Sequence, residues 1–177
     1  MAFTLYDASV ANYLQILGGV SGYLNKGLAH FRENGVDPET IVETRLLDPG
    51  REAEKLAQAD VVLVDAPCSG SGTWRRNPKA RWRLTPRELE RVTAIQSRLL
   101  DVAAELVRPG GRLVFVTCSV LDAEGADQAA AFLSRHGDWR AERLALGAGE
   151  TRGEGTRLTP ARDGTDGFFI ARFGKLC

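Results

Sequence analysis

Apolar residues recur at helical spacing in the first part of the chain. Spacing of this kind is typical of an amphipathic helix and predicts one over residues 8–31. Four glycines within that segment lower its helix propensity, each by up to ~1 kcal/mol relative to alanine. The apolar positions are Val10, Tyr13, Leu14, Leu17, Val20, Leu24 and Leu28.

Two short runs without a polar residue follow further along. Residues 61–64 and 113–116 consist only of Val, Leu and Phe. Runs of this length and composition are typical of strands that are covered on both faces of a sheet. We therefore predict strands over 60–65 and 112–117. Weaker strand patterns cover 41–47, 139–146 and 167–173.

Helical patterns lie between these predicted strands. Thr85, Pro86 and Glu88 have the spacing of an N-cap, a first helical residue and a capping-box acid. Alternation of strands and helices predicts an α/β fold with a parallel, doubly wound sheet. The predicted helices cover 51–58, 85–107 and 122–135, and the predicted loops cover 66–85 and 147–165.

The composition limits the class of protein but does not indicate a function. The chain has 177 residues, 23 basic and 23 acidic, so its formal net charge is 0 at pH 7. That balance neither requires nor excludes a nucleic-acid partner. Three cysteines do not form a disulfide framework, which favours a reduced, cytoplasmic setting. We expect no signal peptide, no membrane span and no metal site, and the oligomeric state stays open.

Cys68 and Cys118 each follow one of the two apolar runs. Neighbouring parallel strands would bring both sulfurs to one carboxyl edge, where open α/β sheets bind ligands. Two thiols in one pocket suggest covalent chemistry, although most free cysteines are simply small buried residues. His30 and His136 are not placed to serve as a base, so a cysteine–histidine site is not expected.

Other polar residues cluster near Cys68. Asp65 ends its strand, and a carboxylate there could bind a polar ring or an amine, or could simply cap a turn. The following segment is basic and contains Trp74 and Trp82. Basic groups neutralise phosphates and aromatic rings stack on bases, so RNA is the favoured partner, with a solvated helix start as the alternative. The basic residues are Arg75, Arg76, Lys79, Arg81, Arg83, Arg87 and Arg91.

These motifs resemble a known family. Asp65-Ala66-Pro67-Cys68-Ser69-Gly70 with Thr117-Cys118-Ser119 resembles the RsmB/NOP2/Sun family of S-adenosylmethionine-dependent RNA cytosine-5 methyltransferases. The likeness runs from about residue 42 to 173. The resemblance implies a Rossmann-like fold and an RNA substrate, with rRNA as the favoured target. The further matching segments are 76–78, the helix around Gln96, 108–111 and 166–169.

The resemblance implies a role for each matching residue. Cys118 would attack C6 of the target cytosine, and Cys68 would help to resolve the adduct. Asp65 would hold the cytosine ring and face the cofactor. Asp48 would lie near the adenine, and Pro67 would line the cofactor site. The residues expected to meet the RNA are Arg75, Arg76, Lys79 and Arg81.

The chain also departs from the family pattern. The family's upstream glycine-rich turn and the first two strands of its sheet are not recognisable, and Gly18-Gly19 lies in a helical pattern. Residues 1 to about 46 instead resemble the start of an uncharacterised bacterial family of DinB-like helical bundles, on residues 1–10 and Asp37-Pro38-Glu39-Thr40. We therefore expect a helical segment of different origin over 1–41 and a truncated methyltransferase domain over 42–177. The alternative function is a non-catalytic, truncated or chimeric protein that binds RNA through residues 74–91.

Overall fold

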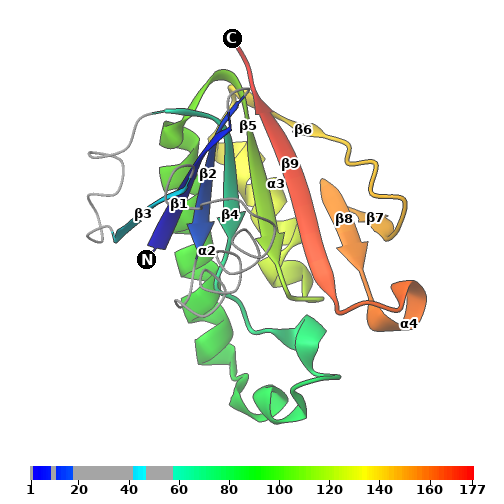
Figure 1. Ribbon diagram of the computed structural model, residues 1–177. Coiled ribbons are helices and arrows are strands. Elements are labelled where there is room, and N and C mark those ends of the chain that lie inside the picture. Colours follow the sequence, from blue (N-terminus) through cyan, green and yellow to red (C-terminus); the bar gives the residue numbers. More distant parts are fainter. Residues whose placement is uncertain (1, 9–10, 18–41, 47–57) are drawn as a thin grey trace.

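The computed structural model describes residues 2–8, 11–17, 42–46 and 58–177, and side chains from residue 58 onward. Within these ranges the chain forms a mixed sheet with helices packed against it (Figure 1). The spatial order of its strands is β3-β1-β2-β4-β5-β9-β8-β7, and β6 pairs with β9 as well. The strands are β1 (Ala2–Ala8), β2 (Ala11–Leu17), β3 (Val42–Leu46), β4 (Ala59–Asp65), β5 (Val107–Thr117), β6 (Trp139–Glu142), β7 (Glu150–Arg152), β8 (Gly155–Leu158) and β9 (Phe168–Lys175).

The two apolar runs form the central pair of this sheet. Strands β4 and β5 are parallel, and Val64 lies opposite Phe115. Strand β9 pairs antiparallel with β5 along one edge. Along its other edge, β9 pairs with β8 near its start and with β6 near its end. Val62, Val64, Leu113 and Phe115 are fully buried, as continuous apolar runs predict. The predicted strands over 60–65 and 112–117 are therefore confirmed.

Two helices, α2 (Pro86–Leu106) and α3 (Ala126–Arg135), pack beside each other against the sheet (Figure 1). Helix α2 begins as predicted, because the Thr85 hydroxyl accepts a hydrogen bond from Glu88 N–H at 3.2 Å. Its buried face includes Leu99, Leu100 and Ala103. The short helix α4 (Pro160–Asp163) precedes β9, and 3₁₀ turns cover Ser71–Thr73, Pro78–Arg83 and Asp122–Glu124.

The predicted N-terminal helix is wrong over Ala11–Leu17, where the structure has strand β2. This strand pairs with β1 on one side and with β4 on the other. The conformation of a short segment depends on its pairing partners more than on its own periodicity, and here the ladders to β1 and β4 provide hydrogen-bond partners for the backbone of Ala11–Leu17. Ala8, the first residue of the predicted helix, lies in β1, and the remainder of that helix, residues 9–10 and 18–31, lies outside the described residues. The predicted helix over 51–58 does as well, apart from its last residue.

Strands β1 and β2 occupy the two sheet positions between β3 and β4. The sequence pattern predicts no strand at these two positions, so that β4 would either have an open edge or pair differently. In the structure β4 has a parallel neighbour on each side, since β2 pairs with it in register from Tyr13 opposite Val61 to Leu17 opposite Asp65. This pairing removes the exposed apolar edge that would invite aggregation.

The chain from 147 to 165 is not the continuous loop that its Gly-rich composition predicts. It contains the β7–β8 hairpin and helix α4. Strand β8 pairs with the start of β9, and Gly155 lies so close to Phe169 that a Cβ there would be 2.4 Å from the ring. The sheet is mixed rather than wholly parallel as predicted, because antiparallel pairs flank the parallel strands β2, β4 and β5 on both sides.

Candidate active site

Two cysteine-bearing turns meet at the carboxyl ends of β4 and β5. Asp65, the last residue of β4, lies opposite Val116. Beyond the strands, Gly72 N–H donates a hydrogen bond to the Cys118 carbonyl at 3.0 Å. The Sγ atoms of Cys68 and Cys118 are 3.3 Å apart, within hydrogen-bonding distance for sulfur. The predicted meeting of both sulfurs at one edge of the sheet is confirmed.

The two half-buried thiols share one hydrogen bond, and it shifts their pKa values in opposite directions. The thiol of Cys68 stabilises a thiolate on Cys118, and this bond lowers the pKa of Cys118 despite partial burial and the charge of Asp65. The same bond raises the pKa of Cys68, with burial and the negative charge on Cys118 acting in the same direction. The shared hydrogen bond therefore favours ionisation of Cys118 over ionisation of Cys68.

Asp65 is a partly exposed carboxylate beside this pair. Burial raises its pKa above the ordinary value of 3.8, because its ionised form loses hydration. A positively charged or hydrogen-bonding ligand at this edge of the sheet would therefore stabilise the ionised form of Asp65. The carbonyl of the neighbouring Pro67 accepts a hydrogen bond from Gln96 Nε2 at 2.9 Å, which ties the Cys68 turn to helix α2.

A fully buried carboxylate, Glu124, lies behind the sulfur pair, and the sequence patterns did not single it out. Its Oε1 accepts hydrogen bonds from Ser69 N–H at 2.7 Å and from Gln96 Nε2 at 3.2 Å. Its Oε2 accepts from the hydroxyls of Ser69 at 2.5 Å and Ser119 at 2.6 Å. The only sequence signal was the repeated Cys-Ser pair, since each serine directly follows a site cysteine.

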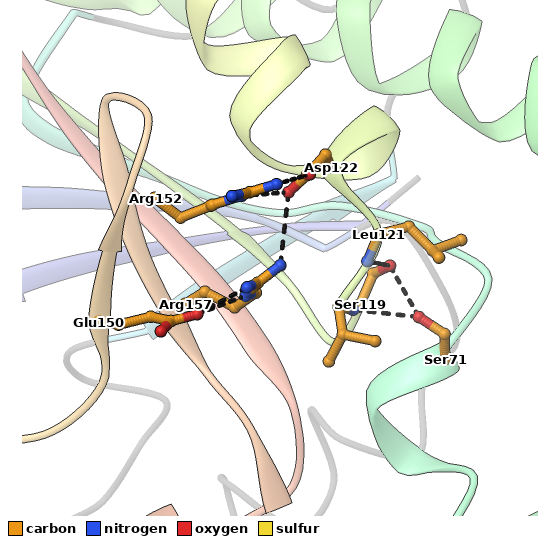
Figure 2. A network of polar contacts seen from close by, with 8 residues as sticks. Ser71, Ser119, Leu121, Asp122, Glu150, Arg152 and Arg157 are labelled. Atoms are coloured by element: carbon orange, nitrogen blue, oxygen red, sulfur yellow. Dashed lines mark hydrogen bonds and ion pairs between the residues drawn. The ribbon is translucent and has the colours of Figure 1, made fainter. Parts of the chain in front are cut away.

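A second polar bridge joins the same two turns. The hydroxyls of Ser71 and Ser119 are 2.9 Å apart and share a hydrogen bond. Figure 2 shows the two side chains pointing toward each other. Val120 N–H donates to the Ser71 hydroxyl at 3.0 Å, and Leu121 N–H donates to the Ser119 hydroxyl at 3.1 Å. Both serines are buried, so these bonds replace water as their partners.

The β7–β8 hairpin supports the turn that carries Glu124. Arg152 of β7 contacts Asp122 with two guanidinium nitrogens, and Arg157 of β8 lies 3.5 Å from the same carboxylate (Figure 2). The hydrogen bond from Arg152 lowers the pKa of Asp122. Arg157 also donates to Glu150 at 2.6 Å. These ion pairs fasten the 3₁₀ turn Asp122–Glu124 to the edge of the sheet.

The basic segment predicted to meet RNA follows the Cys68 turn. Arg76 Nε donates to Asp166 at 2.6 Å, and Arg75 lies 3.6 Å from the same carboxylate. Both arginine side chains are still about 60% exposed. The Arg81 guanidinium lies 4.4 Å from the ring centroid of Trp82, whose side chain is 76% exposed. The segment thus presents cationic groups and one aromatic ring to solvent, while Asp166 anchors its start.

The described part of the chain holds neither a metal cluster nor a membrane-spanning helix. No group of three or more His, Cys, Asp or Glu side chains there could hold a metal ion. None of the described helices is long and apolar enough to cross a bilayer.

A comparison with protein families decides the chain's affiliation. The family model described as 16S rRNA methyltransferase RsmB/F matches residues 35–174. The chain belongs to this family. The RsmB/F match includes both cysteine turns, helices α2 and α3 and nearly all of β9, and it confirms the resemblance drawn from the motifs.

Individual relatives agree with the RsmB/F assignment. Ribosomal RNA small subunit methyltransferase B of Xylella fastidiosa is 47% identical over 116 residues, which are 66% of this chain and 27% of that protein. The protein of the same name from Pectobacterium atrosepticum is 34% identical over 151 residues, 84% of this chain and 34% of its own length. The structure of NSun6 from Pyrococcus horikoshii with SFG matches with a TM-score of 0.74 and 26% identity, covering 92% of this chain and 41% of that one.

The RsmB/F chain spans about a quarter to a third of these two curated relatives. Among the residues predicted for its site, the structure brings Asp65, Pro67, Cys68 and Cys118 together at one edge of the sheet. Asp48 lies outside the described residues. The roles of these residues, and the division into segments 1–41 and 42–177, stay predictions.

Proposed function

We propose that this chain carries the methyl-transfer centre of an RNA cytosine-5 methyltransferase that acts on small-subunit rRNA. The observation that supports it most is the sulfur pair, 3.3 Å apart, whose shared hydrogen bond lowers the pKa of Cys118 and raises the pKa of Cys68. A nucleophile beside a proton-holding partner suits a reaction that makes and then breaks a bond to carbon.

The proposed steps begin at the Cys118 thiolate. Its sulfur bonds to C6 of cytosine, and the electron pair of the C5–C6 double bond moves so that C5 becomes nucleophilic. C5 then bonds to a methyl group, whose former bonding electrons stay with the donor. Cys68 acts with the base that removes the C5 proton. The electrons of the C5–H bond restore the double bond and expel the Cys118 thiolate, leaving 5-methylcytosine and one released proton.

S-adenosylmethionine is the proposed donor, and it supplies an electrophilic methyl group on a positively charged sulfur. The described residues fit such a ligand, because Asp65 is a half-buried carboxylate at the carboxyl end of β4, and a cation nearby would compensate for the hydration that it loses. Asp65 and Pro67 would line the site, with Asp48 as a further contact. Asp65 would also hold the polar edge of the cytosine.

RNA would reach this edge along the basic segment. Arg75, Arg76, Lys79 and Arg81 would contact its backbone, and their partial exposure leaves them accessible to phosphates. The target base must be unstacked to reach Cys118, so a single-stranded or opened region is the proposed substrate. A ribosomal target and reduced thiols would place the protein in the cytoplasm.

Two measurements on the purified chain test this function. Calorimetry should detect S-adenosylmethionine binding, and Asp65→Ala should weaken it. Transfer of a labelled methyl group to 16S rRNA transcripts should be abolished by Cys118→Ala. No binding at millimolar cofactor would contradict the enzymatic function. RNA binding that persists without cofactor binding would instead support the non-catalytic alternative, in which residues 74–91 bind RNA.

A further inference from the structure

Glu124 is the most deeply buried carboxylate near the sulfur pair, with none of its surface exposed. Removing a carboxylate from water is costly unless hydrogen bonds replace the lost hydration. Four donors do so here, and all are neutral: a backbone amide, two hydroxyls and a side-chain amide. Burying a carboxylate among neutral donors costs desolvation free energy that an apolar side chain would not. Packing alone therefore does not explain why Glu124 is buried here.

The hydrogen-bond donors to Glu124 come from three separate segments of the chain. Ser69 follows Cys68 and Ser119 follows Cys118, so one carboxylate holds the residues next to both thiols. Gln96 of α2 completes the set and also binds the Pro67 carbonyl on the other side of Cys68. The two turns are 50 residues apart in the chain, as the separation of their cysteines shows. Glu124 therefore links the two cysteine turns to each other and to the helix behind them.

We propose that Glu124 is a positioning residue that keeps the Cys68 and Cys118 turns at the separation where the two sulfurs share a hydrogen bond. The proposal rests on the proposed function only for the claim that this positioning serves methyl transfer. The effect of Glu124 on the two thiols does not depend on that function. Glu124 does not touch the sulfur atoms in any described hydrogen bond, so it acts through Ser69 and Ser119.

The electrostatic effect of Glu124 is opposite to its positioning effect at Cys118. Among the described residues, and besides each other, the charged groups that act on the sulfur pair are Asp65 and Glu124. For Cys118 the hydrogen bond from Cys68 is the largest influence and lowers its pKa, whereas the charge of Glu124 is the smallest and raises it. Removing only the charge would therefore lower the pKa of Cys118. Separating the turns would raise it, because the larger influence is lost.

Glu124→Gln separates these effects. The amide has one acceptor oxygen instead of two and points a donor at the serine hydroxyls, so the four bonds cannot all persist. The assay is the rate of iodoacetamide alkylation at each cysteine against pH, resolved by peptide mass spectrometry. The exposed Cys177 serves as the internal reference. No cofactor or RNA is needed, so failure of methyl transfer would not affect the result.

Glu124→Gln should move the pH midpoint of Cys118 alkylation upward and that of Cys68 downward. The rate at Cys118 near neutral pH should fall by about threefold to tenfold, since below the midpoint each pKa unit is a factor of ten in thiolate. Glu142→Gln is the matched control. It alters a carboxylate held by Arg112 and Arg172, toward the other end of β5, and should leave both midpoints unchanged.

Ser69→Ala is the second variant, in case Glu124→Gln does not fold. It removes one hydroxyl donor but keeps the Ser69 N–H bond, and it should shift Cys118 in the same direction by a smaller amount. Circular dichroism checks the fold of each variant. A Cys118 midpoint that falls or does not move in folded Glu124→Gln or Ser69→Ala would overturn the positioning role.

Discussion

Gly72→Ala tests whether the turn after Cys68 depends on a close backbone contact. A Cβ at residue 72 would lie 2.0 Å from the Gly167 carbonyl oxygen and 2.5 Å from its carbon. Both are backbone atoms, so the two segments would have to separate by more than about an ångström; overpacking of this kind costs ~1–3 kcal/mol. Separation would also break two hydrogen bonds, Gly167 N–H to the Gly72 carbonyl and Gly72 N–H to the Cys118 carbonyl.

Each of these bonds contributes about 1 kcal/mol, so together with the overpacking Gly72→Ala should lower the free energy of unfolding by roughly 3–5 kcal/mol. Urea denaturation followed by circular dichroism measures this loss, which corresponds to a Tm about 10 °C lower. Gly137→Ala is the matched control, because a Cβ at Gly137 meets nothing within 4 Å. A stability of Gly72→Ala within about 0.5 kcal/mol of the control would refute the contact argument.

Three further changes probe the core, a helix start and an ion pair. Phe132→Ala should cost about 3–5 kcal/mol in urea denaturation, because the Phe132 side chain is fully buried; a loss under 1 kcal/mol would contradict that packing. Thr85→Ala should cost about 1 kcal/mol by removing the cap on Glu88 N–H, and Thr85→Ser should restore most of it. The hydrogen bond from Arg76 lowers the pKa of Asp166, so its stabilisation is present above pH 3.8 and is lost as the pH falls through the depressed pKa. Asp166→Asn should flatten the dependence of stability on pH in that acid range, and an unchanged acid profile would argue against the pair.

The central part of the fold was predictable because its signals are local. The apolar run at the end of β4 needs cover on both faces whatever its neighbours are, and the structure buries Val62 and Val64 completely. The start of α2 depends only on Thr85 and Glu88, which lie three residues apart. The meeting of Cys68 and Cys118 then followed from parallel strand order alone.

The features that the sequence did not predict depend on partners that are distant along the chain. Strand β2 exists between β1 and β4, and no periodicity within Ala11–Leu17 encodes those neighbours. The β7–β8 hairpin is held by pairing with β9 and by arginines that reach Asp122. Glu124 was overlooked for the same reason, because its donors come from the Cys68 turn, the Cys118 turn and helix α2.

Trapping with RNA that contains 5-fluorocytosine tests the central claim most directly. Fluorine at C5 cannot leave as a proton does, so the bond between protein and base should survive denaturation. With S-adenosylmethionine present, the account predicts a covalent complex that maps to Cys118 by mass spectrometry. The complex should be absent in Cys118→Ala and should persist in Cys68→Ala. A complex attached through Cys68, or none at all in a chain that binds both cofactor and RNA, would contradict the account.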